Sequence, residues 1–225
     1  MSTSKPSYHH GDLRAALVRA AFELLDEGDS ELSLRAVARR AGVSPSAPYR
    51  HYADRDALAS AVAAVGYEEL MGRLVAVRAA PPSSSPSSPS STPPLPFPST
   101  LDEIADLAVA YVRFALERPA LFRIMFIDPC DRDSEERVAA VAAITLFVRG
   151  AVERLFPASD PDALATAAWA LVHGLAFLFL DGKLDASDPA VVEQRVREAC
   201  LALLTASARA PISTDVPPHV ASTGS

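Results

Sequence analysis

Residues 33–52, SLRAVARRAGVSPSAPYRHY, limit the possible folds of this chain more than any other stretch of the sequence. Leu34, Val37 and Ala38 recur at spacings of three and four residues, which predicts a short helix with one apolar face. Ser33 stands directly before them, where its hydroxyl can accept an amide proton of the first helical turn. The stretch is therefore expected to open with a short helix that begins at a defined residue.

A second short helix is expected after a turn. Gly42 follows the first helix at a position where the left-handed conformation of a helix stop favours glycine. Ser44 is placed to cap the next helix and Pro45 to occupy its first position. Helix, glycine-containing turn and helix together predict a helix-turn-helix, although geometry alone also allows a surface helical hairpin. Residues 46–52 carry small, aromatic and basic side chains, which suit a face that enters a DNA major groove.

The distribution of charge favours the same interpretation. The chain has 21 lysines and arginines against 28 acidic residues, a net charge of −7 that by itself argues against nucleic-acid binding. Between Ser33 and Arg55, however, five arginines and a single acidic residue give +4, which leaves −11 for the remainder. Positive charge is thus concentrated on the predicted helix-turn-helix, and the rest of the chain should avoid DNA.

The remaining sequence is predicted to be helical, without a strand pattern or an internal repeat. Apolar spacing, caps and prolines predict helices at about 12–27, 54–79, 101–118, 119–127, 134–155, 161–182 and 189–208. The expected fold is all-α, with an N-terminal three-helix helix-turn-helix domain at 8–55, a C-terminal helical bundle at 56–210 and a tail at 211–225. The long helix at 54–79 should join the two domains. In the helix at 134–155, the expected inward positions are Val138, Val141, Ala142, Thr145, Val148 and Val152.

A proline- and serine-rich segment interrupts the helices. Residues 81–99 contain eight prolines and eight serines, a composition that cannot sustain a helix or bury much surface. We therefore expect an extended connection at about 80–100. An alternative function follows from this composition, namely that of a helical protein-interaction module that presents this segment to a partner.

The eighteen residues from Ala163 to Leu180 contain no charged side chain, which is the length of a minimal membrane span. Six alanines, His173 and Gly174 make the stretch only mildly apolar. We expect instead a helix buried on two sides, by its own core and by a second subunit. With a polar N-terminus that lacks a signal-peptide pattern, and with only two cysteines (Cys130 and Cys200), the expected location is the cytoplasm.

The run from Tyr8 to Leu58, with YHHGDLR ahead of the first helix and SLRAVARRAGVSPSAPYRHYADRDAL after it, resembles the DNA-binding domain of the TetR family of transcriptional regulators. Trp169 followed by His173-Gly174, together with PALFRIMF, resembles a subgroup of that family. The resemblance implies a homodimer with a variable ligand-binding domain. It also implies that the last two helices of each subunit, about 161–182 and 189–208, form the dimer interface.

The same resemblance implies a set of DNA contacts on double-stranded operator DNA. The candidate residues are Ser33, Arg35, Ser44, Ser46, Ala47, Pro48, Tyr49, His51, Tyr52 and Arg55. Tyr49 and Ser44 are expected to touch phosphates, and Ser46, Ala47 and Pro48 to face base edges. Pro48 departs from the commonest family pattern, which has an aliphatic residue there. Because proline lacks an amide proton and restricts the residue before it, the start of the second helix should be distorted.

A small-molecule pocket is expected among the C-terminal helices. Its candidate lining consists of aromatic side chains with one methionine and one histidine: Tyr67, Tyr111, Phe114, Phe122, Met125, Phe126, Trp169, His173 and Phe177. The few charges among them favour a neutral or aromatic ligand, which His173 could orient. The alternative is that these side chains simply fill the core.

Sequence patterns of catalysis are missing, since there is no Gly-x-Ser-x-Gly, P-loop or His-Glu-x-x-His motif. Adjacent His9 and His10 lack the further ligands of a metal site, so no enzyme activity, metal or cofactor is expected. The predicted function is that of a ligand-responsive repressor. A ligand wedged against the helix at 54–79 would change the separation of the paired recognition helices, which must reach successive major grooves about 34–36 Å apart on a palindromic operator.

Overall fold

The computed structural model describes residues 10–28, 32–79, 97–126, 131 and 133–209. Their elements are α1 (His10–Asp26), α2 (Leu34–Arg40), a 3₁₀-helix η1 (Pro48–Arg50), α3 (Arg55–Ala79), α4 (Leu101–Glu117), α5 (Pro119–Phe126), α6 (Glu135–Leu155), α7 (Pro161–Leu180) and α8 (Pro189–Arg209). Every regular element in these described ranges is a helix, which confirms the predicted all-α fold. The expected extended connection at 81–99 falls mostly, and the tail at 211–225 wholly, outside the described residues.

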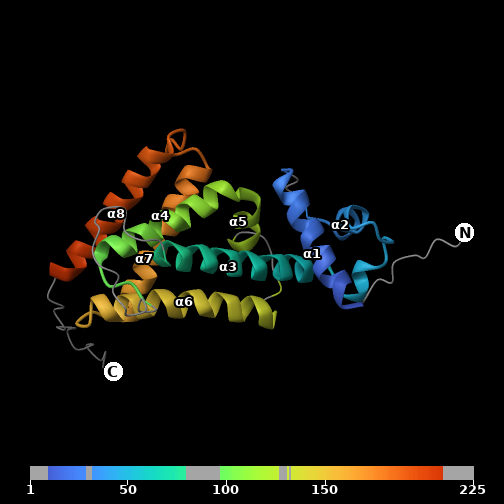
Figure 1. The fold of residues 1–225 in the computed structure, drawn as a ribbon, viewed down its shortest axis with the longest axis horizontal. Coiled ribbons are helices and arrows are strands. Elements are labelled where there is room, and N and C mark those ends of the chain that lie inside the picture. Colours follow the sequence, from blue (N-terminus) through green and yellow to red (C-terminus); the bar gives the residue numbers. More distant parts are fainter. Residues whose placement is uncertain (1–9, 29–31, 80–96, 127–130, 132, 210–225) are drawn as a thin grey trace, which may run out of the picture.

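Helix α3 joins the two parts of the molecule (Figure 1). Its first turns contact α1, and further along it packs against α4, α5 and α6. Its 25 residues give it a length of about 37 Å at 1.5 Å per residue. Helices α1 and α2 gather at one end of α3, while α6 runs alongside it. One continuous helix therefore connects the N-terminal helices with the C-terminal bundle, as the sequence predicted.

Local signals place the helix ends where the sequence predicted them. Ser33 accepts the amide of Ala36 at 3.2 Å, and Asp54 accepts the amide three residues on at 2.9 Å. Asp160 caps α7 in the same way, with Pro161 in the first position. The last helix is capped by Asp188, which accepts the amide of Ala190 at 2.8 Å. The first helix begins at His10, two residues before the expected cap Asp12.

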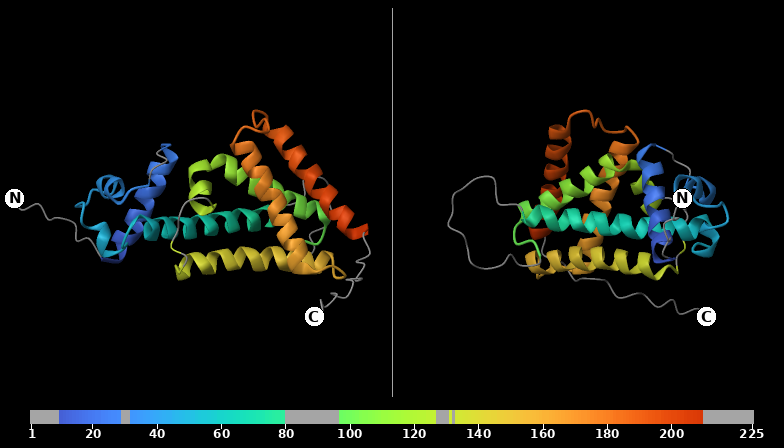
Figure 2. Two further views of the ribbon diagram at one scale, coloured as in Figure 1. Left: turned by 180° about the vertical axis from the view of Figure 1, so that it is seen from behind. Right: turned by 45° about the vertical axis from the view of Figure 1, so that its right-hand side comes forward.

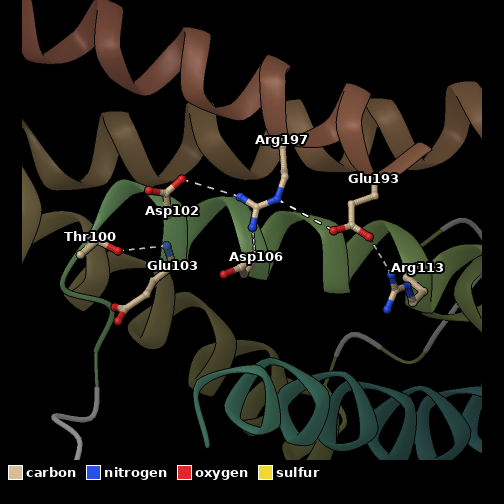
Figure 3. A network of polar contacts seen from close by, with 7 residues as sticks. All are labelled: Thr100, Asp102, Glu103, Asp106, Arg113, Glu193 and Arg197. Atoms are coloured by element: carbon tan, nitrogen blue, oxygen red, sulfur yellow. Dashed lines mark hydrogen bonds and ion pairs between the residues drawn. The ribbon is translucent and has the colours of Figure 1, made fainter. Parts of the chain in front are cut away.

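Helix α8 is held against α4 by a group of ion pairs (Figure 3). The Arg197 guanidinium lies between Asp102, at 3.8 Å, and Asp106, both on α4. Glu193, one turn before Arg197, pairs with Arg113 at 3.1 Å. Figure 2 shows α7 and α8 as neighbouring helices at the edge of the bundle. The network fixes α8 to its own subunit on one side.

The burial predicted for α6 is wrong in part. Val138, Ala142 and Thr145, which were expected to point inward, are exposed, whereas Ala151 and Val152 are buried. The reason is that this helix carries alanine and valine on most of its circumference, so its apolar spacing does not single out one face. Contact with α3 and α7 selects the face instead.

One described helix, α7, is long and apolar enough to cross a membrane by length and composition alone. Only 22% of its apolar window is buried within the single chain. The outward side of α7 carries Ala163, Ala167, Ala170, Gly174 and Leu178, all of them exposed. An uncharged helix face of this kind requires some cover from outside the chain.

Candidate nucleic-acid interface and aromatic cluster

The segment of residues 44–52 does not form the predicted second α-helix. It consists of a turn followed by η1. In the turn, the amide of Ala47 donates to the Ser44 carbonyl at 2.9 Å. The amides of His51 and Tyr52 both bond the Pro48 carbonyl, each at 2.9 Å. Because Pro48 has no amide proton, it cannot donate to the Ser44 carbonyl four residues earlier, and the helix tightens to 3₁₀ geometry. The predicted distortion is confirmed, and its extent is larger than expected.

The turn before this segment follows the sequence prediction more closely. Gly42 has φ of +69°, the left-handed conformation expected of it. The Ser44 hydroxyl, expected to cap a helix, instead lies 3.3 Å from the Ser46 hydroxyl. These two hydroxyls are both exposed and form a small polar pair on the surface.

Most of the candidate DNA-contact residues lie on the outside of the N-terminal part. Ser33, Arg35, Ser44 and Ser46 are exposed, and Tyr49 is 53% exposed although it is aromatic. Ala47 and His51 are half-buried at the edge of the same surface. These seven side chains define the outer face of the helix-turn-helix segment, and we refer to them as the outer face below.

Two candidates do not belong to that face. Pro48 is buried, and Tyr52 is only 3% exposed within the core. Their apolar rings turn toward the interior because the segment has little other apolar surface with which to attach itself to the domain. The expectation that Pro48 faces base edges, and that Tyr52 contacts DNA, is therefore wrong. Both residues hold the segment in place.

Arg55 has a mixed environment. Its Nε donates to the Leu32 carbonyl at 3.2 Å, and its Nη1 lies 3.5 Å from Asp56. The side chain is half-buried, so part of its donor capacity is used within the protein. It ties the start of α3 to the loop before α2, and this role limits the phosphate contact that the resemblance implies.

Other arginines near the outer face differ in whether they are neutralised. Arg40 pairs with Glu27 and lies 3.5 Å from Glu23, so its charge is compensated within the protein. Arg35, Arg39 and Arg50 are exposed, and no ion pair joins them to any residue in the described ranges. Arg39 and Arg50 were missing from the predicted contacts, although their position off the apolar face was a usable signal. Arg35 of the outer face and two further arginines of the same segment, Arg39 and Arg50, are therefore exposed and have no ion pair with a described residue.

The aromatic residues predicted to line a pocket are brought together between α3, α4, α5 and α7. Phe122 lies at the centre, with ring centroids 4.7 Å from Phe126 and 5.4 Å from Phe177. His173 lies 4.7 Å from Phe126, and Tyr67 stands edge-on to Phe126 at 5.4 Å. The rings contact one another closely, as in a packed core. Two open hollows on the described surface lie elsewhere, one between Phe97 and α6 and the other along α8.

A chain of polar contacts crosses this aromatic cluster. Trp169 Nε1 donates to the Tyr111 hydroxyl at 3.4 Å, and the Tyr111 hydroxyl lies 3.0 Å from Nδ1 of His173. Burial lowers the pKa of His173 and raises that of Tyr111, so both are neutral near pH 7. In the tautomer of His173 that carries its hydrogen on Nε2, Nδ1 accepts the Tyr111 proton. Trp169 remains 47% exposed at the outer edge, which departs from an enclosed pocket.

Cys200 is buried in α8, and burial raises the pKa of its thiol to about 11. The thiol is therefore protonated and unreactive under ordinary conditions. Cys130 falls outside the described residues. No cluster of three or more potential metal ligands occurs within the described ranges.

Comparison with known proteins addresses both parts of the chain. The family model "Bacterial regulatory proteins, tetR family" matches residues 17–62, and "Tetracyclin repressor-like, C-terminal domain" matches residues 104–211. An uncharacterized helix-turn-helix-type transcriptional regulator of Haemophilus influenzae is 53% identical over 47 residues. That match covers 20% of this chain and 23% of the relative, so the chain aligns with less than a quarter of the relative's length.

Solved structures share the overall fold. A protein of unknown function from Rhodococcus sp. RHA1 is 29% identical, with a TM-score of 0.66 over 87% of this chain and 97% of that chain. A TetR-family transcriptional regulator from Streptomyces coelicolor, 17% identical, has a TM-score of 0.64 over 89% of this chain and 84% of that chain. Together the two family models match more than half of the sequence. The chain belongs to the TetR family of bacterial transcriptional regulators.

Proposed function

We propose that the protein is a ligand-responsive transcriptional repressor that binds a palindromic operator as a homodimer. The composition of the outer face carries the proposal, because it has exposed hydroxyls, an exposed tyrosine and Arg35, and the same helix-turn-helix segment exposes Arg39 and Arg50, on a chain whose net charge is −7. Phosphates require such concentrated cations, and base edges require small polar or methyl groups. In this proposal residues 8–55 form the DNA-binding domain and 56–210 the ligand-binding and dimerisation domain.

The residues of the outer face divide the work of recognition. Tyr49 and Ser44, with the exposed Arg35, contact phosphates and set the position of the protein on the duplex. Ser46 and Ala47 face base edges and carry sequence preference. The 3₁₀ geometry presents these side chains from a turn, so the number of base contacts per subunit is small.

Selection of bound duplexes from a random pool tests the function directly. The expected result is an enriched sequence with two half-sites related by a two-fold axis. Tyr49→Ala should then weaken binding to selected and scrambled duplexes alike, because phosphate contacts carry no sequence information. Ser46→Ala should change preference at one base position, a difference of about 1–3 kcal/mol per contact. No enrichment, or the reverse division between the two variants, would contradict the proposal.

The homodimer is proposed to form through α7 and α8, at about 161–182 and 189–208. The support is the uncharged outward side of α7, which the single chain leaves uncovered, with α8 beside it. A second copy would bury this side and complete a four-helix bundle. We also propose that the chain belongs to the TetR subgroup marked by Trp169 and His173-Gly174, which lie on this helix.

An apolar or aromatic small molecule is proposed to enter the aromatic cluster and to release the operator. The support is the concentration of rings beside the neutral pair of Tyr111 and His173, whose Nε2 hydrogen could meet a ligand carbonyl. Entry would require the rings to move apart and push on α3. The ligand can shift DNA binding only through its different affinity for the two states.

Trp169 is the only tryptophan of the chain and reports on that site. A panel of neutral aromatic compounds should include one that quenches its fluorescence and weakens operator binding at the same concentrations. A compound that quenches Trp169 and leaves operator affinity unchanged would reject release by this route.

A further inference from the structure

An ion pair joins the N-terminal part of the molecule to α6. Arg14, on α1, donates from Nη1 and Nη2 to the two oxygens of Glu136 at 2.6 and 2.7 Å. The residues are 122 positions apart in sequence. The contact is bidentate, which fixes orientation as well as distance. Hydrogen bonding from Arg14 lowers the pKa of Glu136, whose place in the first turn of α6 also favours negative charge.

Arg14 has a second contact, with Tyr52 in the segment of residues 44–52 that is proposed to read DNA. Its guanidinium carbon lies 5.8 Å from the ring centroid of Tyr52, a residue with almost no exposed surface. The amide of Tyr52 in turn donates to the Pro48 carbonyl at 2.9 Å and closes η1. One side chain therefore separates Glu136 of α6 from the ring that anchors the segment of residues 44–52.

A second ion pair between α1 and the C-terminal part, found among the described residues, does not have this position. Arg118 lies 3.4 Å from Asp26 and over the Phe22 ring at 5.5 Å, and it also faces Glu69 of α3 at 3.7 Å. It holds the opposite end of α1. Figure 1 shows this end of α1 near α5, whereas Arg14 lies in the first half of the helix.

We infer that Arg14 is a positioning residue that couples α6 to the segment of residues 44–52 through Glu136 and Tyr52. The inference rests on the proposed DNA-binding function. A segment held in one position loses less freedom when it binds, so the pair should strengthen operator binding without touching DNA. Both side chains are about half exposed, at 50% and 52%, so the effect is small. Exposed pairs of this kind correspond to about a two- to fivefold change in an equilibrium constant.

A double-mutant cycle on operator affinity tests the coupling in the full-length protein. Arg14→Gln and Glu136→Gln should each weaken binding by about two- to fivefold, and the double variant should be no weaker than either single variant. The charge-reversed pair, Arg14→Glu with Glu136→Arg, should not recover the loss, because it removes the cation beside the Tyr52 ring and places one in the first turn of α6. Glu153→Gln is the matched control, because Glu153 pairs with Arg149 at 2.9 Å on the same helix and is similarly exposed. It should leave binding unchanged.

The salt dependence of binding separates positioning from direct contact. If Arg14 only positions the segment, the slope of log affinity against log salt should be the same in all variants. A slope reduced by about one in Arg14→Gln alone would show that Arg14 neutralises a phosphate, and would overturn the inference. Additive losses in the two single variants would also overturn it.

Amide hydrogen exchange without DNA gives an independent readout. Glu136→Gln should speed exchange at residues 44–52, whereas Glu153→Gln should not. Equal exchange in these two variants would refute the coupling even if the protein binds its operator. Failure of the unmodified protein to bind any duplex would instead reject the proposed function, and the exchange result would still decide whether α6 holds the segment.

Discussion

At the residue scale, the buried tyrosines Tyr67 and Tyr52 differ in whether the hydroxyl makes a hydrogen bond. The Tyr67 hydroxyl donates to the Met125 carbonyl at 2.9 Å and so satisfies an acceptor in the last turn of α5. The Tyr52 hydroxyl is buried without a hydrogen-bond partner among the described residues. Its ring anchors the segment of residues 44–52. Burial raises the pKa of its hydroxyl, and the nearby Arg14 opposes that rise.

The two tyrosines give a matched pair of predictions. Tyr67→Phe should lower the free energy of unfolding by about 1 kcal/mol, because a buried hydrogen bond is lost and a carbonyl is left unpaired. Tyr52→Phe should leave the free energy of unfolding unchanged or raise it by up to about 1 kcal/mol, because it removes a desolvated hydroxyl. Urea denaturation of both variants measures the difference. A larger loss in Tyr52→Phe than in Tyr67→Phe would be inconsistent with this account.

His173 gives stability a pH dependence of known sign. Burial lowers its pKa below the ordinary value of 6.5, so the unfolded chain takes up a proton at a higher pH than the folded chain does. The contribution of His173 is therefore complete above about pH 6.5 and is lost as the pH falls from there through the lowered pKa. Acidic groups also titrate in this range, so the comparison needs a variant.

Urea denaturation between pH 7.5 and 5 should show a smaller decrease in the free energy of unfolding for His173→Phe than for the unmodified protein. The constant loss of the Tyr111 hydrogen bond does not affect this slope. Parallel curves for the two proteins would mean that His173 titrates alike in the folded and unfolded chains.

At the scale of elements, α3 contains two glycines in different surroundings. A Cβ atom at Gly66 would lie 2.7 Å from Met125 Sδ and 3.0 Å from Leu121 Cδ1, so α5 packs directly on the backbone of α3 there. A Cβ atom at Gly72 would meet nothing within 4 Å. Gly66 is thus required by the packing of α5 on α3. Gly72 weakens the helix, and no packing contact within the described chain requires it.

Substitution by alanine should separate these two cases. Gly72→Ala should raise the free energy of unfolding by about 0.5–1 kcal/mol through helix propensity. Gly66→Ala gains the same propensity but overpacks buried Met125 and Leu121, which costs about 1–3 kcal/mol. We expect Gly66→Ala to be at least about 1 kcal/mol less stable than Gly72→Ala in urea denaturation. Equal stabilities would show that α5 can shift freely.

At the scale of the whole molecule, the uncovered side of α7 makes dimerisation testable. Gly174 lies in the middle of that side, and a Cβ atom there would meet nothing in the single chain. Gly174→Leu should leave the fold of each subunit intact. It should weaken the dimer at least about fivefold, since overpacking of a close helix contact costs about 1–3 kcal/mol.

Sedimentation of dilution series measures this effect. Gly72→Leu is the matched control, because Gly72 is also exposed and unobstructed but lies on α3. The two variants should differ in dimer dissociation and agree in helix content. If both remain equally dimeric, α7 does not form the interface at Gly174.

The local features of this chain were predictable from neighbouring residues. Ser33, Asp54 and Asp160 cap their helices, and Pro48 distorts the one that it enters, because caps and prolines act within a single turn. The aromatic side chains that were expected to gather come from four helices, α3, α4, α5 and α7. The resemblance to the TetR family supplied the functional assignment, and five of the ten proposed contact residues, Ser33, Arg35, Ser44, Ser46 and Tyr49, are exposed.

The sequence by itself therefore determined where most of the helices begin, and where positive charge is concentrated. Tertiary structure alone decided that Tyr52 is buried, that Arg40 is neutralised by Glu23 and Glu27, and which side of α6 faces the core. It alone brought Arg14 to Glu136. The physical reason is range: caps and prolines act between adjacent turns, whereas burial and pairing depend on how separate helices pack against one another.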